Sequence, residues 1–112
     1  MNWIALTSDA QLNEIDQLSQ SKKIFIFKHS TTCSISHAAL NRLERNWKDS
    51  DNQLITTYYL DLLRYRNLSN EVARKYNIVH ESPQLLFIEN GKCSYNSAHF
   101  EINYADLMKE IS

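Results

Sequence analysis

A short apolar run near the start of the chain constrains the fold more than any other feature of the sequence. Residues Ile24 to Phe27 are β-branched or aromatic, with no alternation between apolar and polar side chains. A strand of this kind is typically buried on both faces, as in the centre of a parallel sheet covered by helices. Because parallel strands need long crossover connections, the run predicts an α/β fold.

Strand and helix patterns alternate along the rest of the chain. The predicted strands cover residues 3–6, 24–27, 54–60, 85–88 and 92–96. The first predicted helix begins at a Ser8–Gln11 capping box, and the second begins near Cys33. A short helix is predicted over residues 67–77, with Ser69 as its N-cap, and a terminal helix is predicted to begin at Asn103. Asn90-Gly91 predicts a tight hairpin between the last two strands.

The resulting order, β-α-β-α-β-α-β-β-α, is the connectivity of the thioredoxin-like fold, in which helices cover a central mixed sheet. With 112 residues, the chain is expected to form one domain over residues 1–112.

The candidate reactive group is Cys33, at the junction between the buried strand and the most amphipathic helix. The first amides of a helix have no partner within the helix, and the helix dipole is positive there. Both favour a thiolate, the attacking species in disulfide exchange. Ser36 gives the motif C-x-x-S, in which a hydroxyl can donate a hydrogen bond to the sulfur but cannot resolve a mixed disulfide. The alternative is that Cys33 is a small buried apolar residue.

Two histidines flank the cysteine, four residues away on each side. His37 would lie one helical turn past Cys33 and, when protonated, could add to thiolate stabilisation. Cys33 and His37 also have the spacing of two metal ligands, with His29 as a third candidate, but a metal needs further ligands, so we predict none. His80 and His99 are expected to be ordinary surface histidines.

The second cysteine, Cys93, lies just past the predicted hairpin turn, at the opposite end of the sheet from Cys33. A distance on the order of 20 Å is expected from the rise of a strand. Because a disulfide needs Cα atoms within about 7 Å, Cys93 should not resolve Cys33 within one molecule.

The net charge and the length of the apolar runs exclude several classes of binding partner. The net charge of −1 provides no basic surface for nucleic acid or anionic membrane. No apolar run approaches the roughly 20 residues of a membrane span. No signal-peptide pattern opens the sequence, so the cytoplasm is the expected compartment.

Residues Phe27 to Ser36, FKHSTTCSIS, resemble the FKHSTxCPIS signature of the YtxJ-type family of bacillithiol-system redox proteins. Four other blocks are similar to that family: Leu40–Arg42, Tyr59–Leu62, His80–Gln84 and Asn90–Gly91. The chain departs from the signature at Ser34, where proline is usual and would preorganise the start of the helix.

The resemblance implies a thioredoxin-like fold and a monothiol bacilliredoxin activity. Cys33 would attack a protein–bacillithiol mixed disulfide, take the small thiol, and be regenerated by a second thiol. S-thiolated proteins and bacillithiol would be the partners, with no tightly bound cofactor. In thioredoxin folds a cis-proline faces the reactive cysteine, so Pro83 is expected to be cis.

Site residues follow from this interpretation. Cys33 is the expected nucleophile and Ser36 its helper, with His29 and His37 as supporting groups. Thr32, Ser34, Ser82 and Pro83 are expected to contact substrate. A non-catalytic adaptor on the same scaffold, or a redox-sensing stress protein, are the alternative hypotheses.

Overall fold

The computed structural model describes residues 1–111 and confirms the predicted order of strands and helices. The strands of the described chain are β1 (Trp3–Ala5), β2 (Lys23–His29), β3 (Ile55–Asp61), β4 (Gln84–Glu89) and β5 (Lys92–Ala98). Its helices are α1 (Asp9–Leu18), α2 (Ser34–Asn46), α3 (Asp51–Leu54), α4 (Arg66–Lys75) and α5 (Tyr104–Ile111), with a 3₁₀ turn η1 (His99–Glu101).

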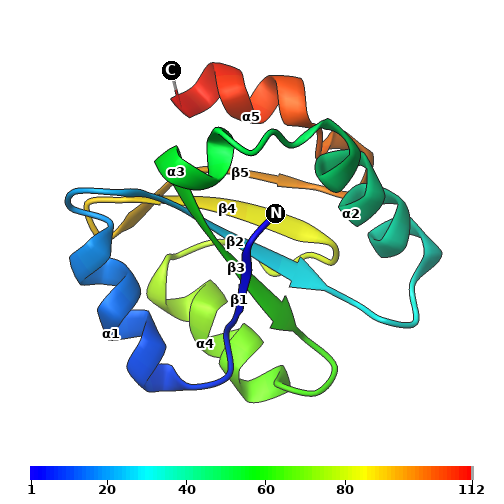
Figure 1. Ribbon diagram of the computed structural model, residues 1–112. Helices are drawn as coiled ribbons and strands as arrows, with labels where there is room; N and C mark the ends of the chain where they lie inside the picture. The colour runs from blue at the N-terminus through cyan, green and yellow to red at the C-terminus, as the bar shows by residue number, and fades with distance from the viewer. Residues whose placement is uncertain (112) are drawn as a thin grey trace.

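One mixed sheet runs through the fold in the order β1-β3-β2-β4-β5 (Figure 1). The central strand β2 is parallel to β3 and antiparallel to β4, and β5 pairs with β4 as the outer strand. The carboxyl ends of β1, β3 and β2 therefore meet at one edge, and β4 begins at that same edge. Strand β5 ends there as well, because its last residue Ala98 pairs with Gln84. Loops next to all five strands of the described chain therefore converge at this edge.

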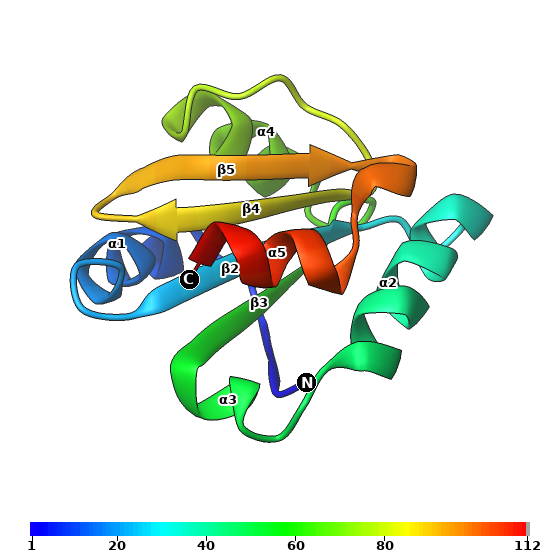
Figure 2. The same cartoon turned by 90° about the horizontal axis from the view of Figure 1, so that it is seen from above.

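The apolar run in β2 is buried on both faces, as its composition predicts. Ile24 and Ile26 belong to a core cluster shared with α1 and α4, while Phe25 and Phe27 belong to one shared with α2 and α5. Figures 1 and 2 show these helix pairs on opposite faces of the sheet. Each residue of β2 from Ile24 to His29 is buried, as is Ser30 directly after it, which fixes the strand that leads to Cys33.

The hairpin between β4 and β5 turns at Asn90 and Gly91, which have φ angles of 52° and 74°. Positive φ at both turn residues is what a two-residue hairpin with Asn-Gly requires. The Gly91 N–H donates to Ser19 Oγ at 2.8 Å, so the turn is anchored to the end of α1.

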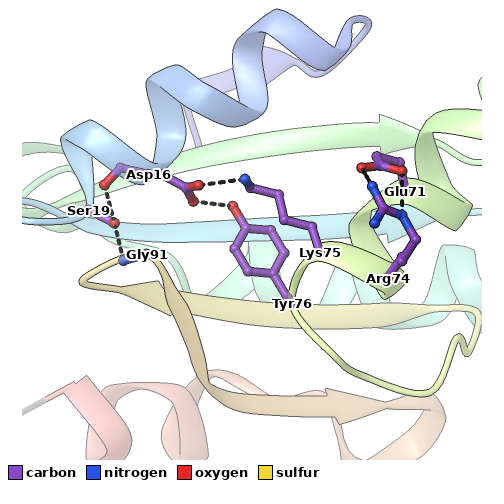
Figure 3. A network of polar contacts seen from close by, with 7 residues as sticks. All are labelled: Asp16, Ser19, Glu71, Arg74, Lys75, Tyr76 and Gly91. Atoms are coloured by element: carbon purple, nitrogen blue, oxygen red, sulfur yellow. Dashed lines mark hydrogen bonds and ion pairs between the residues drawn. The ribbon is translucent and has the colours of Figure 1, made fainter.

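Polar contacts join α1 to α4 at this end of the sheet (Figure 3). Asp16 accepts a hydrogen bond from the Tyr76 hydroxyl at 2.8 Å and pairs with Lys75 at 2.7 Å. Burial and the neighbouring Asp16 raise the pKa of Tyr76, so its hydroxyl stays a donor at neutral pH. A separate ion pair, Arg74 with Glu71, lies on the surface of α4.

The predicted start of the third strand is wrong. Leu54 was expected in a strand but ends the short helix α3, with its side chain exposed. The Asp51 carboxylate accepts hydrogen bonds from the Lys48 N–H at 3.0 Å and the Tyr104 hydroxyl at 2.7 Å, which stabilise this extra turn. The strand β3 therefore begins one residue later, at Ile55.

The prediction that Ser69 caps a helix is also wrong. Helix α4 begins at Arg66, and the Ser69 N–H already donates to Tyr65 O at 2.9 Å. Burial of Leu68 in the core draws the preceding turn into the helix. Ser69 lies inside α4, buried, and its hydroxyl has no partner among the described residues.

Helices of residues 1–111 are all too short or too polar to cross a lipid bilayer.

Candidate active site

Cys33 is the N-cap residue of α2, as the sequence predicts. Its backbone is extended, its N–H donates to Ser30 O at 3.2 Å, and its carbonyl accepts from His37 N–H at 3.1 Å. The thiol is free and partly exposed, and it makes no capping hydrogen bond to the described amides of α2. The sulfur therefore lies at the positive end of a 13-residue helix, where anions are favoured.

Ser36 is fully buried one turn along α2, where its hydroxyl has two partners. Its Oγ accepts from the Ser30 N–H at 3.0 Å and lies 2.6 Å from His29 Nδ1. Because a hydroxyl carries one proton, donation to a neutral His29 competes with the predicted donation to Cys33. The role of Ser36 toward the sulfur stays a prediction.

The ring of His29 is buried beneath the loop that carries Cys33. Burial lowers the pKa of His29, and the nearby His37 lowers it further, against an opposing effect of Asp61. His29 is therefore neutral at physiological pH, which leaves Nδ1 able to accept the Ser36 proton.

His37, in the first turn of α2, contacts both the loop and His29. Its Nε2–H donates to Thr31 O at 2.9 Å, and its ring meets that of His29 edge-to-face with centroids 4.7 Å apart. The structure thus brings the two predicted supporting histidines together. They contact each other and the loop and α2 around residues 30–33.

The predicted substrate contacts fall into two groups. Thr32 and Ser34 are exposed on either side of Cys33. The second group is Ser82 and Pro83, whose peptide bond is cis, as predicted. Lys28 pairs with Gln84, so Pro83 lies beside the carboxyl end of β2, from which the loop to Cys33 starts. The Ser82 hydroxyl is buried without a partner among the described residues.

Arg42 connects α2 to the turn beside Pro83. Its guanidinium donates to His99 O at 3.1 Å and to Ile102 O at 3.0 Å. The His99 N–H in turn donates to Pro83 O at 3.2 Å, with His99 held at a positive φ of 56°. Helix α2 and the cis-proline are therefore linked through one turn.

Cys93 lies at the other end of the sheet. It pairs with Ile88, which pairs with Ile24 near the start of β2, whereas Cys33 follows the end of that strand. The five residue steps from Ile24 to His29 alone span roughly 17 Å. Burial raises the pKa of Cys93, and its Sγ–H donates to Tyr95 O at 3.3 Å, consistent with a structural thiol.

Within residues 1–111, no group of three or more histidine, cysteine, aspartate or glutamate side chains is placed to hold a metal ion. Whether the protein binds a metal ion is a question of binding, so the expectation that it binds none stays a prediction.

Sequence reasoning missed three residues that organise this edge: Lys28, Arg42 and Gln84. Lys28 and Gln84 are both fully buried. Each stands next to an apolar run at the end of a core strand, and a polar residue in that place is the signal that could have identified them. No signal in the sequence identifies Arg42, because the spacing of residues along a helix does not show which distant carbonyls a long side chain reaches.

Comparisons with known proteins agree with this geometry. A solved protein with a thioredoxin fold shares 33% sequence identity, with a TM-score of 0.85 over 98% of this chain and 94% of that chain. The thioredoxin Mala s 13 of Malassezia sympodialis shares 16% identity, with a TM-score of 0.74 over 96% and 85%. Schistosoma mansoni thioredoxin shares 21%, with a TM-score of 0.70 over 99% and 96%. These last two show the fold.

Residues 4–107 match the family model described as monothiol bacilliredoxin BrxC, which spans nearly all of the sequence. This match covers the Cys33 loop, the cis-proline, strands β2 to β5 and all but the first residue of β1. The family predicted from the FKHSTTCSIS block is thereby confirmed: the chain belongs to the monothiol bacilliredoxin BrxC family.

Proposed function

We propose that this protein is a monothiol thiol–disulfide oxidoreductase that removes a low-molecular-weight thiol, such as bacillithiol, from protein mixed disulfides. The bacilliredoxin family and the thioredoxin fold support a thiol redox function. The single observation that carries the finer proposal is the position of Cys33. It is a partly exposed N-cap on the loop that leaves β2 at the end where the cis-proline precedes β4, with serine where a resolving cysteine would stand.

The first step is an exchange at sulfur. The Cys33 thiolate attacks the bacillithiol sulfur of the mixed disulfide, so that a Cys33–bacillithiol disulfide forms and the protein–bacillithiol disulfide breaks. The substrate sulfur leaves as a thiolate and takes a proton from water. The unpartnered amides at the start of α2 stabilise the anionic sulfur before the attack.

The second step regenerates the enzyme and needs an external reductant. A free thiol attacks the small-thiol sulfur of the Cys33 adduct, releases the Cys33 thiolate, and leaves as a disulfide with the small thiol. Ser36 cannot perform this attack, and Cys93 lies too far away to reach Cys33. The electrons therefore come from a second thiol molecule.

Intact-protein mass spectrometry tests the proposal. Wild type, Cys33→Ala and the matched control Cys93→Ala are each mixed with a bacillithiol-modified protein at neutral pH. We expect rapid transfer of the adduct to wild type and to Cys93→Ala, and none to Cys33→Ala. If wild type accepts the adduct no faster than an unstructured cysteine peptide, the proposal fails, and a non-catalytic adaptor becomes the better explanation.

A further inference from the structure

Lys28 is a buried ammonium group without a carboxylate partner among residues 1–111. Its side chain is 0% exposed, and Nζ donates to Ser69 O at 3.0 Å and to His80 Nδ1 at 3.1 Å. The described ion pairs, Arg74–Glu71 and Lys75–Asp16, do not involve it. Burying an unpaired charge is costly, and an apolar side chain of similar length would fill this space at lower cost. Packing alone does not account for a lysine here.

Gln84 lies directly opposite Lys28 on the neighbouring strand and is equally buried. Residues opposite each other in an antiparallel pair share one face of the sheet. The Gln84 amide donates from Nε2 to Val79 O at 3.0 Å and accepts from the Glu81 N–H at 3.3 Å through Oε1. Lys28 and Gln84 thus hold residues 79, 80 and 81 in succession.

The acceptor role of His80 depends on a neutral ring. Burial lowers the pKa of His80, and the neighbouring cations Lys28 and Arg66 lower it further, while Glu81 opposes them. At neutral pH, Nδ1 is therefore free to accept from the Lys28 ammonium. A buried charged donor gives a shorter and stronger hydrogen bond than a neutral one, so the contact restrains the segment.

Residues 79–81, which Lys28 and Gln84 hold, lie directly before Ser82 and Pro83, the predicted substrate contacts. Ser82 follows Glu81 directly and is joined to Pro83 by the cis peptide. Lys28 shares a sheet face with Ile24 and Ile26, the side covered by α1 and α4, whereas the His29 ring stacks with Phe27 of the other core cluster. Any effect of Lys28 on exchange is thus exerted through residues 79–82.

We propose that Lys28 and Gln84 form a buried polar cradle that positions Ser82 and Pro83 to receive the mixed disulfide attacked by Cys33. Lys28 is a positioning residue in this account. The inference rests on the proposed function, because it concerns how the substrate of that same reaction is held. It adds two residues and the His80 contact to the machinery that sequence reasoning identified.

The test compares Lys28→Met with Lys23→Met, a matched control at the other end of β2, whose ammonium binds the Ile111 carbonyl. Three quantities are measured: the kcat and KM of adduct transfer, alkylation of Cys33 by iodoacetamide, and hydrogen exchange of peptides covering residues 77–84. Lys28→Met should lower kcat/KM about tenfold, mainly through KM. Exchange in 77–84 should be faster, while Cys33 alkylation and Tm should not fall. Lys23→Met should transfer like wild type.

A second pair of variants covers the case in which Lys28→Met does not fold. His80 is an exposed residue whose ring is only partly covered at its contact with Lys28. His80→Leu should therefore fold normally and lose transfer, while His80→Asn, which keeps an acceptor, should retain more of it. Wild-type transfer kinetics in His80→Leu, or in Lys28→Met where that variant folds, would overturn the cradle and leave the proposed function standing. Parallel losses of transfer, alkylation and Tm would also overturn it, in favour of a structural role. No transfer by wild type would instead defeat the proposed function and this inference with it.

Discussion

Ser36 Oγ lies 2.6 Å from His29 Nδ1, and both groups are buried beneath the loop that carries Cys33. The same oxygen accepts the Ser30 N–H at 3.0 Å. Ser36, which the sequence predicts to donate a hydrogen bond to the Cys33 sulfur, thus also joins α2 to the loop and to β2. Its removal should affect the stability of the site as well as its chemistry.

The first prediction concerns Ser36→Ala. The substitution leaves the Ser30 N–H and His29 Nδ1 buried without a partner, which should lower the free energy of unfolding by about 1–3 kcal/mol. Urea denaturation of the variant measures it, with the exposed Ser34→Ala as the control, which should match wild type. Equal stability of Ser36→Ala and wild type would contradict the network.

A second prediction concerns pH. Folding lowers the pKa of His29 and His80 below the usual value of 6.5, mainly through burial. The folded state therefore binds these protons less readily than the unfolded chain, and the stability they contribute is present above pH 6.5 and lost as pH falls. NMR titration should give both rings midpoints below 6.5. A midpoint above that value for either ring would refute the assignment of a neutral acceptor.

Lys28 gives a prediction on the alkaline side. Burial lowers its pKa from 10.5 to about 8, so between these values the unfolded chain holds a proton that the folded protein has lost. The free energy of unfolding of wild type should therefore rise, relative to Lys28→Met, as pH increases from 8 to 10.5. The relative gain is roughly 2–3 kcal/mol. Denaturation of both proteins at several pH values checks it, and a constant difference would show that Lys28 titrates normally.

The sequence predicted the parts of this molecule that local pattern controls. Ile24–Phe27 showed a strand buried on both faces, Asn90-Gly91 a tight turn, and Cys33 a helix N-cap, because each depends on residues close together in the chain. The cis state of Pro83 followed from topology. The failures have a common origin in tertiary contacts. Burial of Leu68 moved the start of α4 past Ser69, and the distant Tyr104 hydroxyl helps to hold the turn that ends at Leu54. The partners of Lys28 lie on another helix and another loop, and no spacing rule reveals them.

Arg42 provides a fourth prediction. Arg42→Met removes the donors to the His99 and Ile102 carbonyls and so frees the turn that holds Pro83 O. We expect a loss of about 1–3 kcal/mol in unfolding free energy, together with a higher KM for the mixed disulfide. Arg45→Met, on the exposed side of the same helix, should change neither quantity. If both variants behave alike, the link between α2 and the cis-proline has no energetic importance.

The central claim is that Cys33 is the single working thiol and is regenerated from outside the molecule. The most direct measurement follows the Cys33–bacillithiol adduct by intact and peptide mass spectrometry, first without and then with free thiol. The account predicts an adduct on Cys33 alone that persists until thiol is added and is then released. Loss of the adduct without added thiol, through a Cys33–Cys93 disulfide, or an adduct that forms on Cys93 instead, would contradict it.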